Sequence, residues 1–469
     1  MISKLVMKFR SFTRPLINLI LGAVFLALAG TGYAQDEPLT GPVYIVQEGD
    51  TLTTIASQFG VTVDELLIAN GLSSSNLILI GDAIIIPGLD GVTGVLETRT
   101  VPYGETLRSL SRRYQIPVEK LVKLNRLVSP EELYAGSSLI LPVSSEEVPQ
   151  PNRVVLAQGQ SLLELAVREH VNPWSLAAIN QISSLSRSIP GDVLFVPGQI
   201  LAGPGAFPAP ITEIQISEFY QGETSVVHIF AGDGVSFQGN LLNHSFPFFP
   251  VENGHFAGLQ GIHALAEPGL YPLVVTGTLP DGTPFAHSQS VLVRPLGYLF
   301  ESITVPPALI DPVTTNQEEA FIQPLVNQAT AQRYWQGLFL SPSPCPTCIN
   351  SSFGNRRSYN GSAFTYFHGG VDFPPVALEI TASADGVVVF ADLLEVRGNF
   401  TVIDHGWGVL SAYMHQSEIF VQAGETVKAG QVIGLIGNTG RSTGAHLHWE
   451  IWVGGVQVNP LDWLDTLYP

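Results

Sequence analysis

The chain has 469 residues, of which 45% are hydrophobic and 13% charged, and this composition excludes an intrinsically disordered protein. Its length predicts about three domains or several smaller modules, and its 46 glycines and 34 prolines favour many short strands and turns. The formal net charge of −19 argues against nucleic acid and anionic membrane surfaces as partners, whereas a neutral sugar polymer is compatible with it.

Residues 1–34 have the pattern of a secretory signal peptide. Four basic residues and no acidic residue accompany an almost unbroken apolar run from Leu16 to Ala29, and Gly32-Tyr33-Ala34 provides small residues for cleavage after Ala34. A permanent membrane anchor is the alternative, but the run is short for a bilayer span of about 20 residues. The sequence therefore predicts a secreted protein with no stable membrane insertion after cleavage, and removal of the four basic residues changes its net charge from −19 to −23.

A repeat follows, in which three copies are offset by 55 residues. The copies are VQEGDTLTTIASQFGVTVDELLIANGL, VPYGETLRSLSRRYQIPVEKLVKLNRL and LAQGQSLLELAVREHVNPWSLAAINQI. Each copy predicts a short strand, two short amphipathic helices and a second strand. Asp50 or Thr51 can cap the first helix of the first copy, and Asn70 before Gly71 suits the end of the second helix.

These copies, over residues 43–88, 98–143 and 152–198, resemble LysM domains through the GDTL-type turn, the helix-end asparagine and the closing proline. The resemblance implies binding to polymers that contain N-acetylglucosamine, peptidoglycan or chitin, at the turn between strand and helix. The implied glycan-binding residues are Gly49, Asp50, Thr51, Gly104, Glu105 and Thr106. A glycine needed for a turn and a cap needed for a helix explain the same residues without a ligand. The third copy departs from the pattern at Gln160 and Ser161.

The middle of the chain changes to an alternating, strand-like pattern. Residues 199–210 form a linker, and about seven short strands in 211–296 predict an all-β immunoglobulin-like sandwich, whose five histidines have no ligand spacing. Residues 297–342 predict a partly helical connector. In that connector, Thr315 and Glu318 fit a capping box, and Pro324 should break or kink the helix.

Cys345 and Cys348, in SPCPTC, are the two cysteines of the chain. A CxxC pair can be a redox motif or half of a zinc site, but no second CxxC and no thioredoxin-like βαβ pattern accompanies it. In an exported protein the pair predicts a small local disulfide.

The last part of the chain, residues 343–469, contains a pattern typical of a catalytic zinc site. In AHLHWEIWV, His446 and His448 are two positions apart in a predicted strand, so their side chains face the same way. His368 and Asp372, in FHGGVDFPP, share a face if that segment is extended. Two imidazoles and one carboxylate form a catalytic zinc set that leaves the fourth position for water. The remaining histidine of the pair, and His415 in YMHQS, could then move protons or stabilise the oxyanion.

From about residue 351 to its end, the chain closely resembles the lysostaphin-type (LytM-like) zinc endopeptidases of peptidoglycan. The matching segments include HGGVD, NFTVIDHGWGVLSAYMHQS and GNTGRSTGAHLHWEI. The resemblance implies a small antiparallel all-β fold with a groove over one zinc ion. It assigns the zinc ligands to His368, Asp372 and His448, and the catalytic histidines to His415 and His446.

These observations favour a secreted, monomeric zinc endopeptidase that cuts peptidoglycan stems or cross-bridges and is held on glycan strands by LysM repeats. Two alternatives stay open. The chain could be a non-catalytic or latent wall-binding protein that activates other enzymes, or a zinc peptidase for another glycine-rich protein. The bond that is cut, glycyl-glycine or D-alanyl-diamino-acid, does not follow from the sequence.

Overall fold

The structure is a computed structural model that describes residues 41–74, 78–89, 92–129, 132–143, 151–184, 189–306 and 310–469. The predicted signal peptide lies outside the described residues, as does most of the segment 144–151. No helix within the described ranges is long and apolar enough to cross a membrane. The chain divides into two compact units, Met1–Val95 and Leu96–Pro469.

All three repeats contain the predicted order of strand, helix, helix and strand. The first consists of β1 (Val43–Ile45), α2 (Leu52–Phe59), α3 (Val63–Ala69) and β2 (Ala83–Ile85). The second consists of β3 (Val95–Thr100), α4 (Leu107–Tyr114), α5 (Val118–Asn125) and β4 (Ser138–Val143). The third consists of β5 (Pro151–Val155), α6 (Leu162–Arg168), α7 (Pro173–Ile179) and β6 (Val193–Ile200). The two strands pair antiparallel in the first and third repeats. In both, the second strand contacts the second helix, which contacts the first helix.

Hydroxyl side chains begin the first helix of each repeat. Thr51, Thr106 and Ser161 are the N-cap residues of α2, α4 and α6, and each accepts a hydrogen bond from the backbone three residues later. The side chain three positions after the cap in turn accepts a hydrogen bond from the backbone N–H of the cap residue. Two backbone N–H groups that would otherwise be unpaired are thereby satisfied. Ser161 therefore performs the capping role of threonine in the repeat whose turn differs in sequence.

The repeated asparagine does more than end a helix. In each copy, Asn70, Asn125 or Asn180 donates from Nδ2 to a helix carbonyl and to a carbonyl in the closing strand, and its Oδ1 accepts from the same strand residue. The strand residue is always fifteen positions later. The asparagine thus joins the second helix to the second strand of its own repeat.

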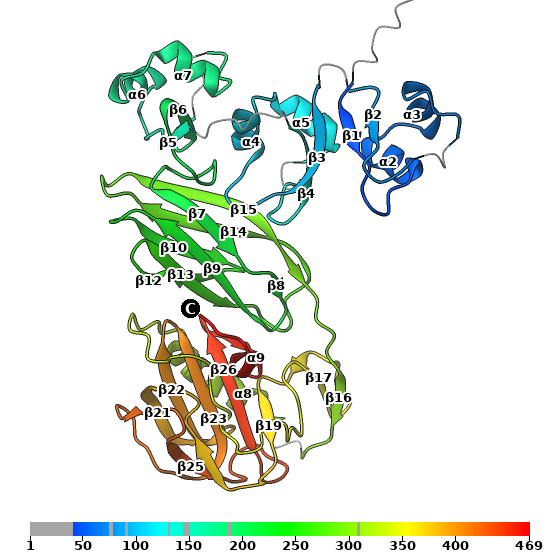
Figure 1. Ribbon diagram of the computed structural model, residues 1–469. Coiled ribbons are helices and arrows are strands. Elements are labelled where there is room, and N and C mark those ends of the chain that lie inside the picture. The colour runs from blue at the N-terminus through cyan, green and yellow to red at the C-terminus, as the bar shows by residue number, and fades with distance from the viewer. Residues whose placement is uncertain are drawn as a thin grey trace, which may run out of the picture. The chain divides into compact units, whose positions relative to one another are not determined.

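Two antiparallel sheets follow and pack face to face (Figure 1). Their strands are β7 (Ile211–Ile216), β8 (Phe219–Tyr220), β9 (Thr224–Ala231), β10 (Ser236–Leu241), β11 (His244–Pro247), β12 (Phe249–Glu252), β13 (His255–Gly261), β14 (Gly269–Thr278) and β15 (Pro284–Arg294). One sheet has the order β11-β10-β14-β15-β8 and the other β12-β13-β9-β7, and only the β15–β8 pair is parallel among these strands. The core between them includes Ile229, Leu273, Val275 and Val291, because alternate residues of each strand face inward.

The C-terminal region is a second, larger β structure. Its elements are β16 (Phe300–Ile303), α8 (Pro312–Val326), β17 (Arg356–Tyr359), β18 (Tyr366–Phe367), β19 (Val371–Phe373), β20 (Glu379–Thr381), β21 (Gly386–Leu394), β22 (Gly398–Gly406), β23 (Val409–Ile419), β24 (Thr426–Val427), β25 (Val432–Ile436), β26 (Leu447–Val453), β27 (Val456–Val458) and α9 (Asp462–Asp465). The main sheet runs β19-β26-β23-β22-β21-β24, and β22, β23 and β26 lie side by side at its centre (Figure 1). Every residue of β26 is buried, so this strand anchors both the core and His448.

Helix α8 corrects two expectations for the connector. Its N-cap is Asp311, which accepts from the backbone N–H of Thr314, so Thr315 and Glu318 do not form the predicted capping box. The helix also continues through Pro324 to Val326, so the proline does not break it, whereas the alternative of a kink stays a prediction. Glu318 is buried instead and accepts three hydrogen bonds, from two backbone N–H groups at 396–397 and from the Arg397 guanidinium.

Candidate metal and catalytic site

Two neighbouring strands bring the metal-ligand candidates together. Asp372 of β19 lies directly opposite His448 of β26 in an antiparallel pair, so both side chains leave the same face of the sheet. His368 precedes β19 and approaches that face across Gly369-Gly370. A Cβ at Gly370 would lie 2.2 Å from the backbone oxygen of Trp449, so only glycine lets this segment pass so close to β26.

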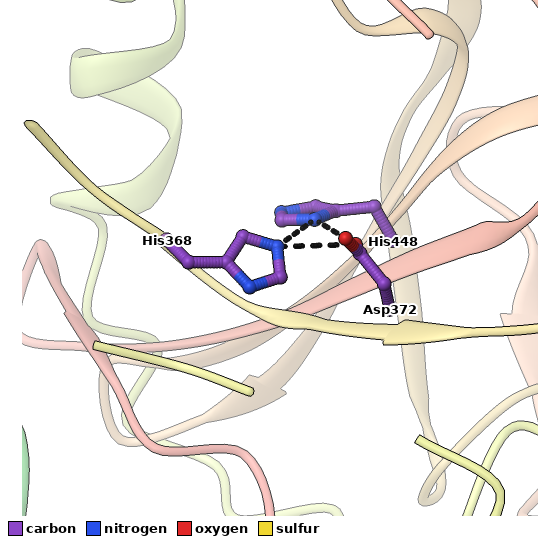
Figure 2. Close-up of side chains that lie close together, drawn as sticks. All are labelled: His368, Asp372 and His448. Carbon is purple, nitrogen blue, oxygen red and sulfur yellow. Dashed lines mark hydrogen bonds and ion pairs between the residues drawn. The ribbon is translucent and has the colours of Figure 1, made fainter. Parts of the chain in front are cut away.

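The three side chains converge on one point (Figure 2). Nε2 of His368 lies 3.1 Å from Oδ1 of Asp372 and 3.0 Å from Nδ1 of His448, and this Nδ1 lies 2.8 Å from the same carboxylate oxygen. The ligand atoms all lie within 4.8 Å of one another, and His368 is only 1% exposed. Two imidazole nitrogens and one carboxylate oxygen at this spacing fit a single zinc ion, with coordination left for water or substrate.

Hydrogen bonds on the far side of each ring fix which nitrogen faces the cluster. Nδ1 of His368 donates to the carbonyl of Ser352 over 2.9 Å, which leaves the Nε2 lone pair toward Asp372. Nε2 of His448 lies 3.1 Å from Oε1 of Glu450, so a proton on Nε2 leaves the Nδ1 lone pair toward the cluster. Glu450 is 3% exposed and also accepts from Trp452 and Gln457.

The charges in this cluster depend on one another. Burial raises the pKa of Asp372, but the adjacent His368 and His448 outweigh burial and hold this pKa well below its usual value. Burial lowers the pKa of His448, and its hydrogen bonds to Asp372 and Glu450 then raise it to about 9. Without a metal ion, His448 therefore carries a proton at neutral pH, and a bound cation would replace that proton.

The two remaining histidines face the same groove. A β-bulge in the β22–β23 pair gives His415 a backbone φ of +62° and re-aims its side chain. Nδ1 of His415 donates to the carbonyl of Thr439 over 2.8 Å, and Nδ1 of His446 donates to that of Gly444 over 2.8 Å. The two ring centres are 4.8 Å apart, and Nε2 of His446 is 3.7 Å from Oδ1 of Asp372. Burial lowers the pKa of His415 to about 3, so this imidazole is neutral at pH 7.

The groove over these residues has a volume of about 310 Å³. All five predicted site residues line it. So do residues that sequence reasoning missed, notably Arg357, Arg397 and Glu450. Glu450 could have been found, because it extends the two-residue spacing of His446 and His448 along the same strand face. Arg357 comes from β17 and Arg397 from the turn between β21 and β22, and neither carried such a signal.

His405 does not belong to the groove. It is fully buried, with Nδ1 hydrogen-bonded to the Asp385 carbonyl and Nε2 to the Ser411 hydroxyl.

Cys345 and Cys348 form the predicted local disulfide.

The two turns proposed to bind glycan differ in accessibility. In the first repeat Thr51 is exposed, and Asp50 accepts hydrogen bonds from Tyr44 and from the Gln47 backbone. In the second repeat Glu105 is only 4% exposed and accepts from Ser109 and from the backbone N–H of Gly205.

Gly104 of the second turn is covered as well. A Cβ added there would lie 2.5 Å from the side chain of Pro204. Gly104 and Glu105 are therefore covered in the structure, and glycan binding by these two residues and by Thr106 stays a prediction. The linker segment 204–207 occupies that place.

Comparisons with known proteins agree with the site. Residues 366–460 match the profile of Peptidase family M23, and residues 44–87 and 100–142 match the LysM domain profile. The chain is 43% identical over 114 residues to peptidoglycan DD-endopeptidase ShyA of Vibrio cholerae, which covers 24% of this chain and 26% of the relative. It is 43% identical over 117 residues to DD-carboxypeptidase/endopeptidase Mpg of Neisseria meningitidis, and this match covers 24% of this chain and 26% of the relative.

Among solved structures, the catalytic domain of lysostaphin from Staphylococcus simulans is 26% identical, with a TM-score of 0.21 and coverage of 31% of this chain and 98% of that one. The chain spans about a quarter of the length of the curated relatives it matches.

Proposed function

We propose that this chain, which carries a Peptidase family M23 metallopeptidase domain and LysM domains, is an extracytoplasmic zinc endopeptidase of peptidoglycan. The observation that carries the proposal is the convergence of His368, Asp372 and His448 in a groove that also contains two further histidines. The names of the relatives specify a DD-endopeptidase. We therefore expect the cut bond to be a D,D cross-link rather than glycyl-glycine.

His368, Asp372 and His448 are the proposed zinc ligands. Bound zinc would polarise the scissile carbonyl and lower the pKa of a water molecule. His415 and His446 each keep a proton on Nδ1 through a backbone carbonyl, which directs Nε2 into the groove. One of them can take the proton of the attacking water and return it to the leaving amine, while the other donates to the oxyanion.

The upstream modules are proposed to hold the enzyme on its polymer. We assign 152–198 as a third LysM domain because it has the same element order and the same asparagine bond to the strand residue fifteen positions later. Glycan binding in the first module would use Gly49, Asp50 and Thr51. Several weak modules on one chain raise the effective concentration of the enzyme at the wall.

We also propose that residues 211–296 form an immunoglobulin-like domain. Their strand order, β12-β13-β9-β7 facing β11-β10-β14-β15-β8, follows the arrangement of that fold. The domain shares a buried apolar interface with the C-terminal domain, where the Phe249 ring stacks on Trp407 at 5.2 Å. This contact supports a role in positioning the peptidase domain.

The proposal is tested by incubating the chain from Gln35 onward with isolated cross-linked peptidoglycan, with and without a chelator. Products are identified by mass spectrometry. We expect release of peptides with new amino termini, lost with the chelator and in His448→Ala and His415→Ala. His170→Asn, which replaces an exposed histidine of the third repeat, is the matched control.

Binding to the wall without cleavage, from a chain shown to contain zinc, would refute the enzymatic proposal. It would favour the alternative of a wall-binding or activating protein. Cleavage of glycyl-glycine bonds would refute only the assignment of the bond.

A further inference from the structure

Strand β16 lies upstream of the matched family region and yet reaches the candidate metal site. It pairs in parallel with β17, and Glu301 lies opposite Arg357 in this pair. Both side chains therefore leave the same face of the small sheet β16-β17-β18. Arg357 lines the groove together with His368 and Asp372, so Glu301 stands directly behind the groove wall.

Glu301 is held by several donors. Its Oε1 accepts from Nδ2 of Asn355 over 2.6 Å, and its Oε2 accepts from Nε of Arg357 over 3.1 Å. The Ser351 hydroxyl lies 3.1 Å from Oε1 of Glu301 and 3.2 Å from Nδ1 of His368. Partial burial raises the pKa of Glu301, but the bonds from Asn355 and Arg357 outweigh it and hold this pKa below its usual value. Glu301 therefore carries a negative charge, which balances the positive charge of Arg357.

Arg357 lies between two carboxylates. Its Nε contacts Glu301, whereas its Nη2 lies 3.7 Å from Oδ2 of Asp372 and donates to Ser351 over 3.0 Å. The side chains of Arg357 and Asp372 are each 14% exposed, so water screens their attraction only weakly. Asp372 thus presents Oδ1 to the two histidines and Oδ2 to the arginine. A fully engaged Arg357–Asp372 pair would compete with a cation for this carboxylate.

We propose that Glu301 is a positioning residue that keeps Arg357 from moving closer to Asp372 than the observed 3.7 Å, so that Asp372 stays available to a divalent cation beside His368 and His448. The inference rests on the proposed function, since it concerns the same metal site. It implies that the functional peptidase unit begins at or before strand β16. A fragment that starts at residue 343 lacks Glu301, and we expect it to bind zinc more weakly than the full chain.

The test is a zinc titration of the full chain in competition with a chromophoric chelator, which measures the zinc dissociation constant without an activity assay. Glu301→Gln keeps the shape of the side chain and removes its charge. Arg357 would then pair with Asp372, and we expect zinc binding to weaken about tenfold, the lower end of the range for groups that support metal ligands. Glu379→Gln, an exposed glutamate of the same domain, is the matched control and should leave zinc binding unchanged.

The second arm removes the arginine. We expect Arg357→Gln to bind zinc at least as tightly as wild type, and the double variant Glu301→Gln/Arg357→Gln to bind within about threefold of Arg357→Gln. The inference is overturned if Glu301→Gln binds zinc like wild type, if the double variant is as weak as Glu301→Gln, or if Arg357→Gln alone weakens binding. Weakened zinc binding by Arg357→Gln would overturn the inference even if Glu301→Gln does not fold. A wild-type chain that binds no zinc would refute the proposed function as well, whereas the outcomes above leave it standing.

Discussion

Replacing Glu318 by alanine should destabilise the C-terminal domain far more than replacing its neighbour Glu319. The side chain of Glu318 is 6% exposed and that of Arg397 is 9% exposed. Glu318 accepts from Nη1 of Arg397 over 2.9 Å and from two backbone N–H groups over 2.7 and 3.0 Å. Its removal leaves a buried guanidinium and two buried donors without this partner.

The expected cost is about 3–5 kcal/mol, the usual penalty for breaking a buried ion pair by removing one member. Glu319 also contacts Arg397, at 2.7 Å, but its side chain is 47% exposed. A surface pair of this kind contributes at most about 1 kcal/mol. If Glu318 acted only as part of a helix cap, its removal would also cost about 1 kcal/mol. A buried ion-pair role and a helix-cap role for Glu318 therefore predict different losses in the free energy of unfolding.

Tryptophan fluorescence during thermal unfolding measures the difference, because five of the six tryptophans lie between residues 335 and 463. For a domain of this size, about 3–5 kcal/mol lowers the unfolding midpoint by roughly 6–20 °C. We expect a fall in that range for Glu318→Ala and of less than about 4 °C for Glu319→Ala. Equal, small shifts for the two variants would refute the argument that Glu318 is an essential buried partner of Arg397.

Three further predictions follow from individual side chains. Burial lowers the pKa of His405 to about 4. As the pH falls, His405 is therefore protonated in the unfolded chain at a higher pH than in the folded chain, which favours unfolding. We expect the free energy of unfolding to fall by about 3 kcal/mol between pH 6.5 and pH 4 because of His405. Urea unfolding at both pH values should show that His405→Gln lacks this part of the pH dependence. His415→Ala should reduce kcat by about 10²- to 10⁴-fold with little change in zinc affinity, and an equal loss of zinc would contradict its role in proton transfer. Asn70→Ala removes three hydrogen bonds, two of them to Ile85, and should cost about 2–3 kcal/mol locally. Hydrogen exchange of the β2 amides should accelerate accordingly, and unchanged exchange would refute the role assigned to this asparagine.

Local patterns in the sequence were enough to predict the repeats and to indicate a zinc site, whereas the resemblance to the peptidase family assigned the individual ligands. A helix cap such as Thr51 acts within three residues, and the spacing of His446 and His448 indicates side chains on one face of an extended segment, although β26 itself begins at Leu447. The pairing of Asp372 with His448 could be inferred because the resemblance to the peptidase family placed both in one site, and the register of β19 and β26 sets them opposite each other.

Long-range contacts decided the rest, because no periodicity along the chain records which distant side chains meet. Sequence spacing suggested a capping box for Glu318, but the structure pairs this residue with Arg397, 79 positions away. The turn at Glu105 has the local form of an open binding loop, yet it is closed by a segment 100 positions later. Glu301 lies in what the sequence indicates is a connector, and only the parallel pairing of β16 with β17 brings it behind the groove. The sequence by itself therefore predicted the repeats and the candidate metal chemistry, whereas the tertiary structure decided which charges surround that site and which repeat turn is covered.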